Sequence, residues 1–173
     1  MRIALLALAA LLTAASAQAQ DRIALAVEGW TATSKPDGIV AYRCASSICA
    51  SGSEVSYKRQ PHRPQLTLDD FRTHHERIAA QSGGVGRLRE LRISAPQQRI
   101  LDGVRVLQLR RDFFWADGTT SALIESRLIG PHASYSLVSV SPRYDWTRNN
   151  FEGFLARMVD IASLATGQSA DAQ

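Results

Sequence analysis

Residues 107–128 read LQLRRDFFWADGTTSALIESRL, and this stretch decides the fold. Two runs rich in aromatic and branched side chains flank the dipeptide Asp117-Gly118. Asp-Gly between such runs is a strong hairpin signal, because glycine adopts a positive φ without a Cβ clash. The sequence therefore predicts a long antiparallel hairpin in the middle of the chain, with Ala116 paired to Thr119 if Asp117 and Gly118 form the whole loop.

This register predicts which charges share a face of the hairpin. It places Arg110 across from Glu125 and Gln108 across from Arg127, and an opposite-charge cross-strand pair is typical of a solvated face. It also places Arg111 opposite Ile124 on the face that is otherwise apolar. A charge there needs a partner, a ligand, or a sheet edge from which its head can reach solvent.

Similar signals extend the sheet in both directions. Asp37-Gly38 predicts a hairpin between residues 30–34 and 39–44, and a further strand is expected over 54–58. Asp102-Gly103 marks another turn. The Gly130-Pro131 turn precedes a strand expected over 133–141.

Two stretches have helical periodicity. The first begins after Thr67, a plausible N-cap followed by two aspartates, and ends at the glycine cluster 83–86. The second is expected over 147–164, with a stripe of apolar side chains that is typical of a core-facing helix: Phe151, Phe154, Leu155, Met158 and Ala162. The predicted fold class is α+β, with a single antiparallel sheet of about six strands in a meander, packed by the mid-chain helix and the C-terminal helix.

The ends of the chain predict an exported protein. Arg2, the apolar run 3–12 and the small residues Ala17 and Ala19 on either side of Gln18 have the pattern of a secretory signal peptide cleaved near Ala19. We therefore expect a signal peptide over 1–19, one α+β domain over 20–167, a flexible tail over 168–173 and a periplasmic or secreted location. No later apolar run is long enough for a transmembrane segment.

The two cysteines, Cys44 and Cys49, are separated by four residues. An even count and an oxidising compartment favour a disulfide, and closing so short a loop contributes roughly 2 kcal/mol. A redox pair would prefer two intervening residues. A zinc site would need two further ligands, which no nearby cluster of His or Cys supplies.

Positive charge is concentrated between residues 87 and 111, within a chain of net charge +4. Alternating arginines on neighbouring strands could gather on one sheet face and bind an anionic small molecule, an anionic surface or an envelope protein. A solvated face neutralised by nearby acids, and a genome that favours arginine codons, remain alternative explanations. The candidate binding residues are Arg87, Arg89, Arg92, Arg110 and Arg111.

No catalytic motif is present in the sequence, and no cofactor or metal site is predicted. The histidines are His62, His74, His75 and His132. His74 suits a surface pair with Asp70, and His75 lies on the apolar stripe of the first helix, where a hydrogen-bonded, partly buried imidazole is expected. The acidic residues mostly have structural explanations at turns and helix starts, which argues against a hydrolase with two carboxylates.

Three features follow one another along the chain: the early hairpin at Pro36-Asp37-Gly38, the mid-chain helix, and the strand and helix around Tyr135-Ser136-Leu137-Val138 and Phe151-Glu152-Gly153-Phe154. This order of elements resembles the PsbP-like family of small exported α+β domains. The cysteine loop and the arginine-rich middle are not features of that pattern. The resemblance implies an accessory or binding role rather than catalysis.

These observations favour a periplasmic binding or accessory protein that is not an enzyme. Two alternatives stay open: an inhibitor or immunity-type protein, and a small enzyme whose histidines converge from distant parts of the chain. Nucleic acid is not expected as a partner, because the location is wrong and the arginines lack interleaved stacking aromatics.

Overall fold

The structure is a computed structural model that describes residues 25–82 and 86–165. The expected signal peptide over 1–19 and the expected tail over 168–173 lie outside the described residues. Within the described residues, no helix is both long enough and apolar enough to cross a membrane.

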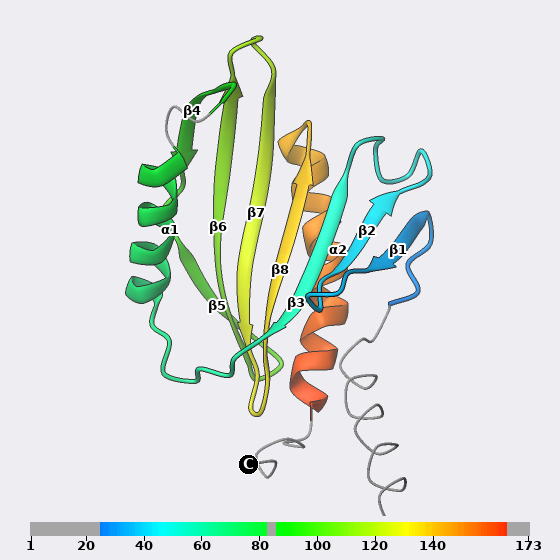
Figure 1. Cartoon of the computed structure of the whole chain (residues 1–173). Coiled ribbons are helices and arrows are strands. Elements are labelled where there is room, and N and C mark those ends of the chain that lie inside the picture. Colours follow the sequence, from blue (N-terminus) through cyan, green and yellow to red (C-terminus); the bar gives the residue numbers. More distant parts are fainter. Residues whose placement is uncertain (1–24, 83–85, 166–173) are drawn as a thin grey trace, which may run out of the picture.

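The described residues form an eight-stranded antiparallel sheet and two helices (Figure 1). The strands pair in the order β1-β2-β3-β8-β7-β6-β4, and β5 also pairs with β6. The α+β class and the single antiparallel sheet are as predicted, with eight strands rather than about six. The elements are β1 (Trp30–Ser34), β2 (Val40–Cys44), β3 (Glu54–Gln60), α1 (Leu68–Ser82), β4 (Leu88–Ile93), β5 (Gln97–Leu101), β6 (Val104–Trp115), β7 (Thr120–Ile129), β8 (Ser134–Ser141) and α2 (Tyr144–Leu164).

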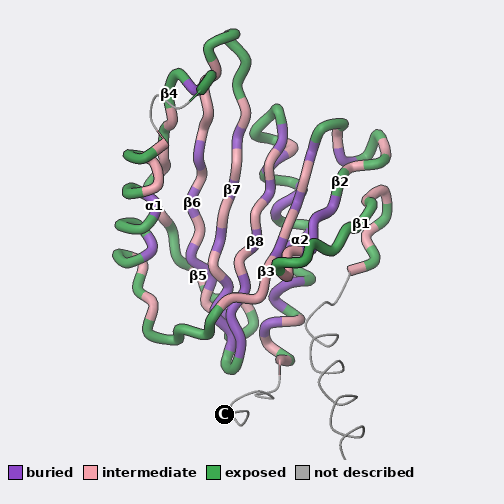
Figure 2. Tube along the Cα trace, in the orientation of Figure 1, coloured by how far each residue is buried: buried purple, intermediate pink, exposed green. Residues whose placement is uncertain are grey.

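One face of the sheet carries the main core, under α2. Figure 2 shows the buried positions alternating along the central strands, as expected when every second side chain points to the same face. Phe151, Phe154 and Met158 of α2 pack there against side chains of β2, β3, β7 and β8. Gly130 allows the close approach of α2, because a Cβ at that position would lie 2.1 Å from the carbonyl oxygen of Ala162.

The other face is covered only in part. α1 packs over the β4–β6 side, where Phe71 joins Leu107, Leu109 and Ile129 in a smaller apolar cluster. Thr67 caps α1 as predicted, because the backbone N–H of Asp70 donates to its Oγ1 at 3.0 Å. This is the face on which the candidate site lies.

The central hairpin has a register shifted by one residue from the prediction. Its loop contains three residues, because the backbone N–H of Trp115 donates to the carbonyl of Thr119 at 3.0 Å. Arg111 therefore pairs with Leu123, Leu109 with Glu125 and Leu107 with Arg127. The predicted pairs Arg110–Glu125 and Gln108–Arg127 are wrong.

The three Asp-Gly turns are not of one kind. At Asp102-Gly103 the loop has two residues with φ of 47° and 79°, and Leu101 pairs with Val104. At Asp37-Gly38 and Asp117-Gly118 only the glycine has a positive φ, of 83° and 81°. These two are three-residue loops in which the glycine alone takes the left-handed conformation.

The predicted disulfide is present. Cys44 and Cys49 are joined by an S–S bond, with their Cα atoms 5.6 Å apart. It closes the loop between β2 and β3. The side-chain amide of Asn150 in α2 also donates to the carbonyl of Cys49 at 3.3 Å, which ties this loop to the helix.

Candidate functional site

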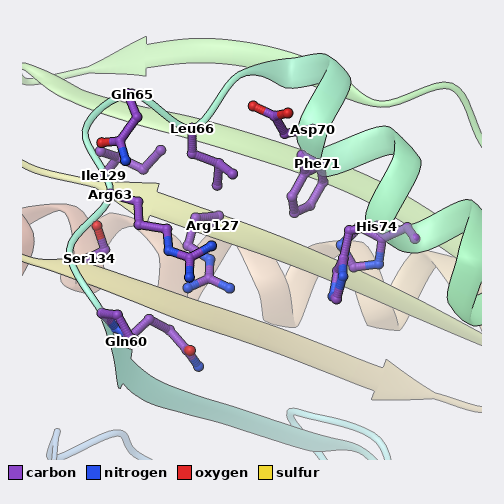
Figure 3. A pocket seen from close by; sticks show the side chains of 12 residues that line it. Gln60, Arg63, Gln65, Leu66, Asp70, Phe71, His74, Arg127, Ile129 and Ser134 are labelled. Atoms are coloured by element: carbon purple, nitrogen blue, oxygen red, sulfur yellow. The ribbon is translucent and has the colours of Figure 1, made fainter.

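A cavity of about 500 Å³ opens on the α1 face of the sheet (Figure 3). Its wall is formed by the end of β3, the segment 61–66, the first turns of α1, and the adjacent ends of β7 and β8. The volume lies within the range of about 300–1,000 Å³ that is usual for small-molecule sites. The cavity brings together residues that are far apart in the sequence.

Two arginines meet in this cavity. Arg63 comes from the exposed segment before α1, and Arg127 comes from β7; Figure 3 shows their guanidinium groups next to each other. Among the described residues, neither guanidinium has a hydrogen bond or ion pair with an acidic side chain at salt-bridge distance. Burial lowers the pKa of Arg127, the charge of nearby Glu125 raises it, and repulsion from Arg63 lowers it further.

The segment that carries Arg63 is held by another arginine. The guanidinium of Arg105 on β6 donates to the carbonyl of Leu66 at 2.7 Å and also to the carbonyl of Pro64. The backbone N–H of Leu66 closes a turn onto the carbonyl of Arg63 at 3.1 Å. Arg63 therefore lies in a loop whose backbone is held in place by hydrogen bonds, even though its own side chain is exposed.

Asp70 is the acidic residue of the cavity wall, and it has a structural role. Its Oδ2 accepts from the backbone N–H of Thr67 at 3.0 Å and from the Thr67 hydroxyl at 2.6 Å. These bonds at the start of α1 lower the pKa of Asp70. The predicted pair between Asp70 and His74 is not formed, because Asp70 caps the helix instead.

A buried polar cluster lies beneath the cavity. Arg111 Nη2 donates to His75 Nδ1 at 2.5 Å and to Glu125 Oε2 at 2.6 Å. His75 is 1% exposed and Arg111 is 9% exposed. Burial, followed by the charge of Arg111, lowers the pKa of His75 to about 3, so the imidazole is neutral at neutral pH.

Further hydrogen bonds order the opposite wall. His62 Nδ1 lies 3.0 Å from the hydroxyl of Ser134, a residue of the cavity wall. The side-chain amide of Gln60 donates to the hydroxyl of Ser136 at 2.9 Å. His62, two residues after the end of β3, thus contacts Ser134, the first residue of the neighbouring strand β8.

The structure places the five predicted arginines at separate locations rather than on one sheet face. Arg87 and Arg89 are exposed near the start of β4, and Arg92 is paired with Glu90 at 2.6 Å. Arg110 points to the α2 side, where it pairs with Asp112 at 2.9 Å and lies over the ring of Tyr144 beside a smaller hollow of about 270 Å³. Arg111 is buried on the α1 side. Binding by any of these residues stays a prediction.

The histidines divide in a similar way. His74 and His75 both line the cavity, with ring centroids 5.1 Å apart, whereas His62 reaches its edge through Ser134. His132 is exposed in the turn between β7 and β8. In the part of the chain that the structure describes, no three His, Cys, Asp or Glu side chains are arranged to hold a metal ion.

Sequence reasoning missed Arg63 and Arg127 as a pair. Arg63 lies in a basic, proline-containing segment, and Arg127 was assigned to the solvated side of the central hairpin. In the correct register Arg127 shares its face with Glu125 and Ile129, toward α1. The available signal was that Arg127 lies two residues after Glu125 and so on the same face of β7. Only the correct register shows that Arg111 and Leu109 share this face, and that Glu125 can therefore pair with Arg111.

Comparisons with known proteins give similarity at the level of the fold. No protein family and no curated protein matches the sequence. A protein of unknown function from Pseudomonas aeruginosa has a crystal structure that matches with a TM-score of 0.53 at 10% identity, covering 79% of this chain and 99% of that one. The solution structure of PsbP from Synechocystis sp. PCC 6803 matches with a TM-score of 0.48 at 15% identity, covering 79% and 82%.

The second of these structures carries the name of the family that the order of elements resembles. At these identities the likeness concerns the fold alone. The function has to be argued from the residues of the cavity.

Proposed function

We propose that this protein is an exported binding module, not an enzyme, that holds an anionic small molecule between Arg63 and Arg127. The observation that carries the proposal is the meeting of these two guanidinium groups in the wall of one cavity. Two like charges placed together raise the free energy of the empty site, and a bound oxyanion would relieve this repulsion. Guanidinium groups also match carboxylate and phosphate oxygens in pairs of parallel hydrogen bonds.

The remainder of the cavity suits such a ligand. Gln60 and Ser134 add neutral polar groups beside the arginines, and Leu66 and Phe71 form an apolar side (Figure 3). A mostly apolar wall with a few converging polar groups is typical of small-molecule sites. We therefore expect an oxyanion, carboxylate or phosphate, attached to a small apolar group.

Export is the second part of the proposal. It is supported by the signal-peptide pattern at residues 1–19 and by the disulfide between Cys44 and Cys49, since disulfides persist in oxidising compartments. The test is to compare the mass of the mature protein from the periplasmic and cytosolic fractions. Full-length protein in the cytosol with both thiols free would overturn this part.

The binding test uses defined anions and matched arginine variants. Inorganic phosphate and benzoate are titrated against the oxidised protein and followed by NMR, alongside vesicles that contain an anionic phospholipid. We expect Arg63→Gln and Arg127→Gln each to weaken binding of the preferred probe by about tenfold or more, as expected for loss of a charge-assisted hydrogen bond. Arg148→Gln is the matched control, because it removes the same charge from an exposed site on α2, which covers the other face of the sheet.

The outcomes distinguish binding in the cavity from a general charge effect, and a soluble anion from a lipid headgroup. Loss of binding in the cavity variants with an unchanged Arg148→Gln variant supports the cavity. Equal losses in all three would indicate a general charge effect and overturn it, as would the absence of binding to any probe. Binding of the vesicles but not of the soluble anions would assign the oxyanion to a lipid headgroup.

A second candidate function rests on the contact between His62 and Ser134. Their side chains lie 3.0 Å apart at the cavity edge, as a serine nucleophile and its base would, beside arginines that could stabilise an oxyanion. Ser134 is only 1% exposed, and no acidic side chain orients His62 within the described residues. Labelling of Ser134 by a fluorophosphonate that is abolished in His62→Ala would favour hydrolysis over binding, and unlabelled protein would exclude it.

A further inference from the structure

His75 lines the cavity and forms a hydrogen bond through one of its two ring nitrogens. It lies on α1 between Phe71, whose ring centroid is 4.3 Å from its own, and the buried guanidinium of Arg111. The question is which of its two ring nitrogens carries the proton. The answer decides whether the cavity meets a donor or an acceptor at this position.

The contact with Arg111 fixes the tautomer. A guanidinium has donors only, so His75 Nδ1, at 2.5 Å from Arg111 Nη2, must accept a hydrogen bond. Glu125 Oε2 lies 3.8 Å from the same nitrogen and itself accepts from Arg111 at 2.6 Å. The proton of the neutral ring is therefore on Nε2.

Nε2–H has no acceptor among the described residues, since the hydrogen bond described for the ring is the one at Nδ1. We propose that His75 donates this N–H to an oxygen of the anion held by Arg63 and Arg127, and that Arg111 and Glu125 are positioning residues for His75. This inference rests on the proposed function and adds to it a neutral donor. It also narrows the ligand to an oxyanion with an oxygen to spare beyond those bound by the two guanidinium groups.

The lowered pKa of His75 agrees with its role as a neutral donor. Burial and the charge of Arg111 keep the pKa of His75 near 3, so the ring stays a neutral donor of fixed orientation between pH 5 and 8. The charged and titratable groups around it are Arg111 on β6, Glu125 and Arg127 on β7, and His74 on α1. A neutral donor beside two cations adds a hydrogen bond without adding to their repulsion.

The first test needs no ligand. Two-bond ¹H–¹⁵N correlation spectra of the oxidised protein, with His75 assigned by loss of its signals in a variant, report which ring nitrogen is protonated. We expect an unprotonated Nδ1 and a protonated Nε2 throughout pH 5–8. A protonated Nδ1 or a doubly protonated ring at pH 7 would overturn the inference.

The second test uses two variants, each of which keeps a polar group near only one of the two ring nitrogens of His75. His75→Asn places an amide near the position of Nδ1, so it keeps an acceptor for Arg111 but removes the donor at Nε2. His75→Gln places its amide near Nε2, so it keeps a donor to the cavity. With inorganic phosphate as the probe, we expect about tenfold weaker binding for His75→Asn and a change of about twofold or less for His75→Gln.

The results distinguish this inference from the function on which it rests. If Arg127→Gln loses phosphate while His75→Asn binds it like wild type, the proposed function stands and the role of His75 is wrong. Equal weakening by His75→Asn and His75→Gln also contradicts the donor role, because it indicates a packing effect. If wild-type protein binds none of the three probes, phosphate, benzoate or the anionic vesicles, the proposed function itself fails.

Discussion

The two faces of the sheet are built on different principles. Under α2, the core is a continuous set of aliphatic and aromatic side chains, among them Tyr42, Phe151 and Phe154. Under α1, a smaller apolar cluster adjoins a buried polar cluster and the open cavity. The larger apolar core therefore lies under α2, and the two guanidinium groups of the proposed binding site lie on the α1 face.

The two faces also differ in how they accommodate the neighbouring arginines Arg111 and Arg110. Arg111 is 9% exposed and has both a carboxylate and an imidazole as acceptors. Its neighbour in sequence, Arg110, points to the α2 side and lies near the surface over Tyr144. Burial of a charge is tolerated where it is paired and hydrogen-bonded, and here the pairing also orients a residue of the cavity.

The largest expected effect would break the apolar face. Phe154→Ala removes a ring that is 2% exposed and packed against Trp30 and Tyr42, at centroid distances of 5.2 and 4.9 Å. We expect it to lower the free energy of unfolding by about 3–5 kcal/mol, the usual cost of such a cavity. Denaturant unfolding measures the change.

Phe71→Ala is the matched comparison on the α1 face. Its ring is 4% exposed, but the space it leaves would merge with the open cavity instead of creating a sealed void. We expect a loss smaller than that of Phe154→Ala by about 1 kcal/mol or more, because the cost depends on the void that remains. A loss as large as that of Phe154→Ala would show that the two faces contribute equally.

Much of this fold could be predicted from the sequence. Alternating apolar residues, turn dipeptides, the cap at Thr67 and the stripe of Phe151, Phe154 and Met158 are local signals, and they indicated the sheet and both helices. The even number of cysteines and the expected export indicated the disulfide. No bounds were predicted for β4 and β5, and the expected count was about six strands instead of eight, although the arginines of this region were expected on neighbouring strands. The register failed at Asp117-Gly118, because a two-residue loop and a three-residue loop both place glycine at a positive φ.

The candidate site was less accessible to sequence reasoning. A shift of one residue moves every side chain to the other face, so it moved Arg127 away from α1 and separated Arg111 from Glu125. The sequence left three alternatives open for Arg111: a partner, a ligand or a solvent-exposed sheet edge. The structure gives it two partners, His75 and Glu125, which only the tertiary structure brings to it. The meeting of Arg63 and Arg127 depends on the path of a loop that has no periodic signal.

The second prediction breaks the buried polar cluster on the α1 face. Arg111→Met keeps the apolar stem but leaves Glu125 and His75 without their shared donor. We expect a loss of about 1–3 kcal/mol, the usual cost of leaving hydrogen-bonding groups unpaired. We also expect the pKa of His75 to rise from its lowered value, because the positive charge beside it is gone. An unchanged stability would indicate that the cluster is not formed in solution.

The third prediction sharpens the comparison through pH. The pKa of His75 is lowered to about 3 in the folded protein, against an ordinary value of 6.5. Between these values the unfolded chain binds a proton at His75 and the folded chain does not. Stability therefore falls as pH is lowered from about 6.5 toward 3, by at most about 1.4 kcal/mol per pH unit from this group.

The measurement is the free energy of unfolding as a function of pH for wild type and for His75→Gln. The difference between the two curves isolates the contribution of His75 from those of the other titratable groups. We expect the difference to grow as pH decreases below 6.5. Parallel curves would mean that His75 has the same pKa in the folded and unfolded states.

The smallest expected effect concerns the exposed ion pair that joins β5 to α2. Both carboxylate oxygens of Glu152 accept from Arg99 Nη2, at 2.8 and 3.0 Å, but the two side chains are 35% and 46% exposed. Solvent screens such a pair, so a double-mutant cycle with Arg99→Gln and Glu152→Gln should give a coupling energy of at most about 1 kcal/mol that declines with added salt. A larger, salt-independent coupling would place an electrostatic contribution on the α2 face as well. In that case the contrast between an apolar face that stabilises and a charged face with a proposed binding role would have to be abandoned.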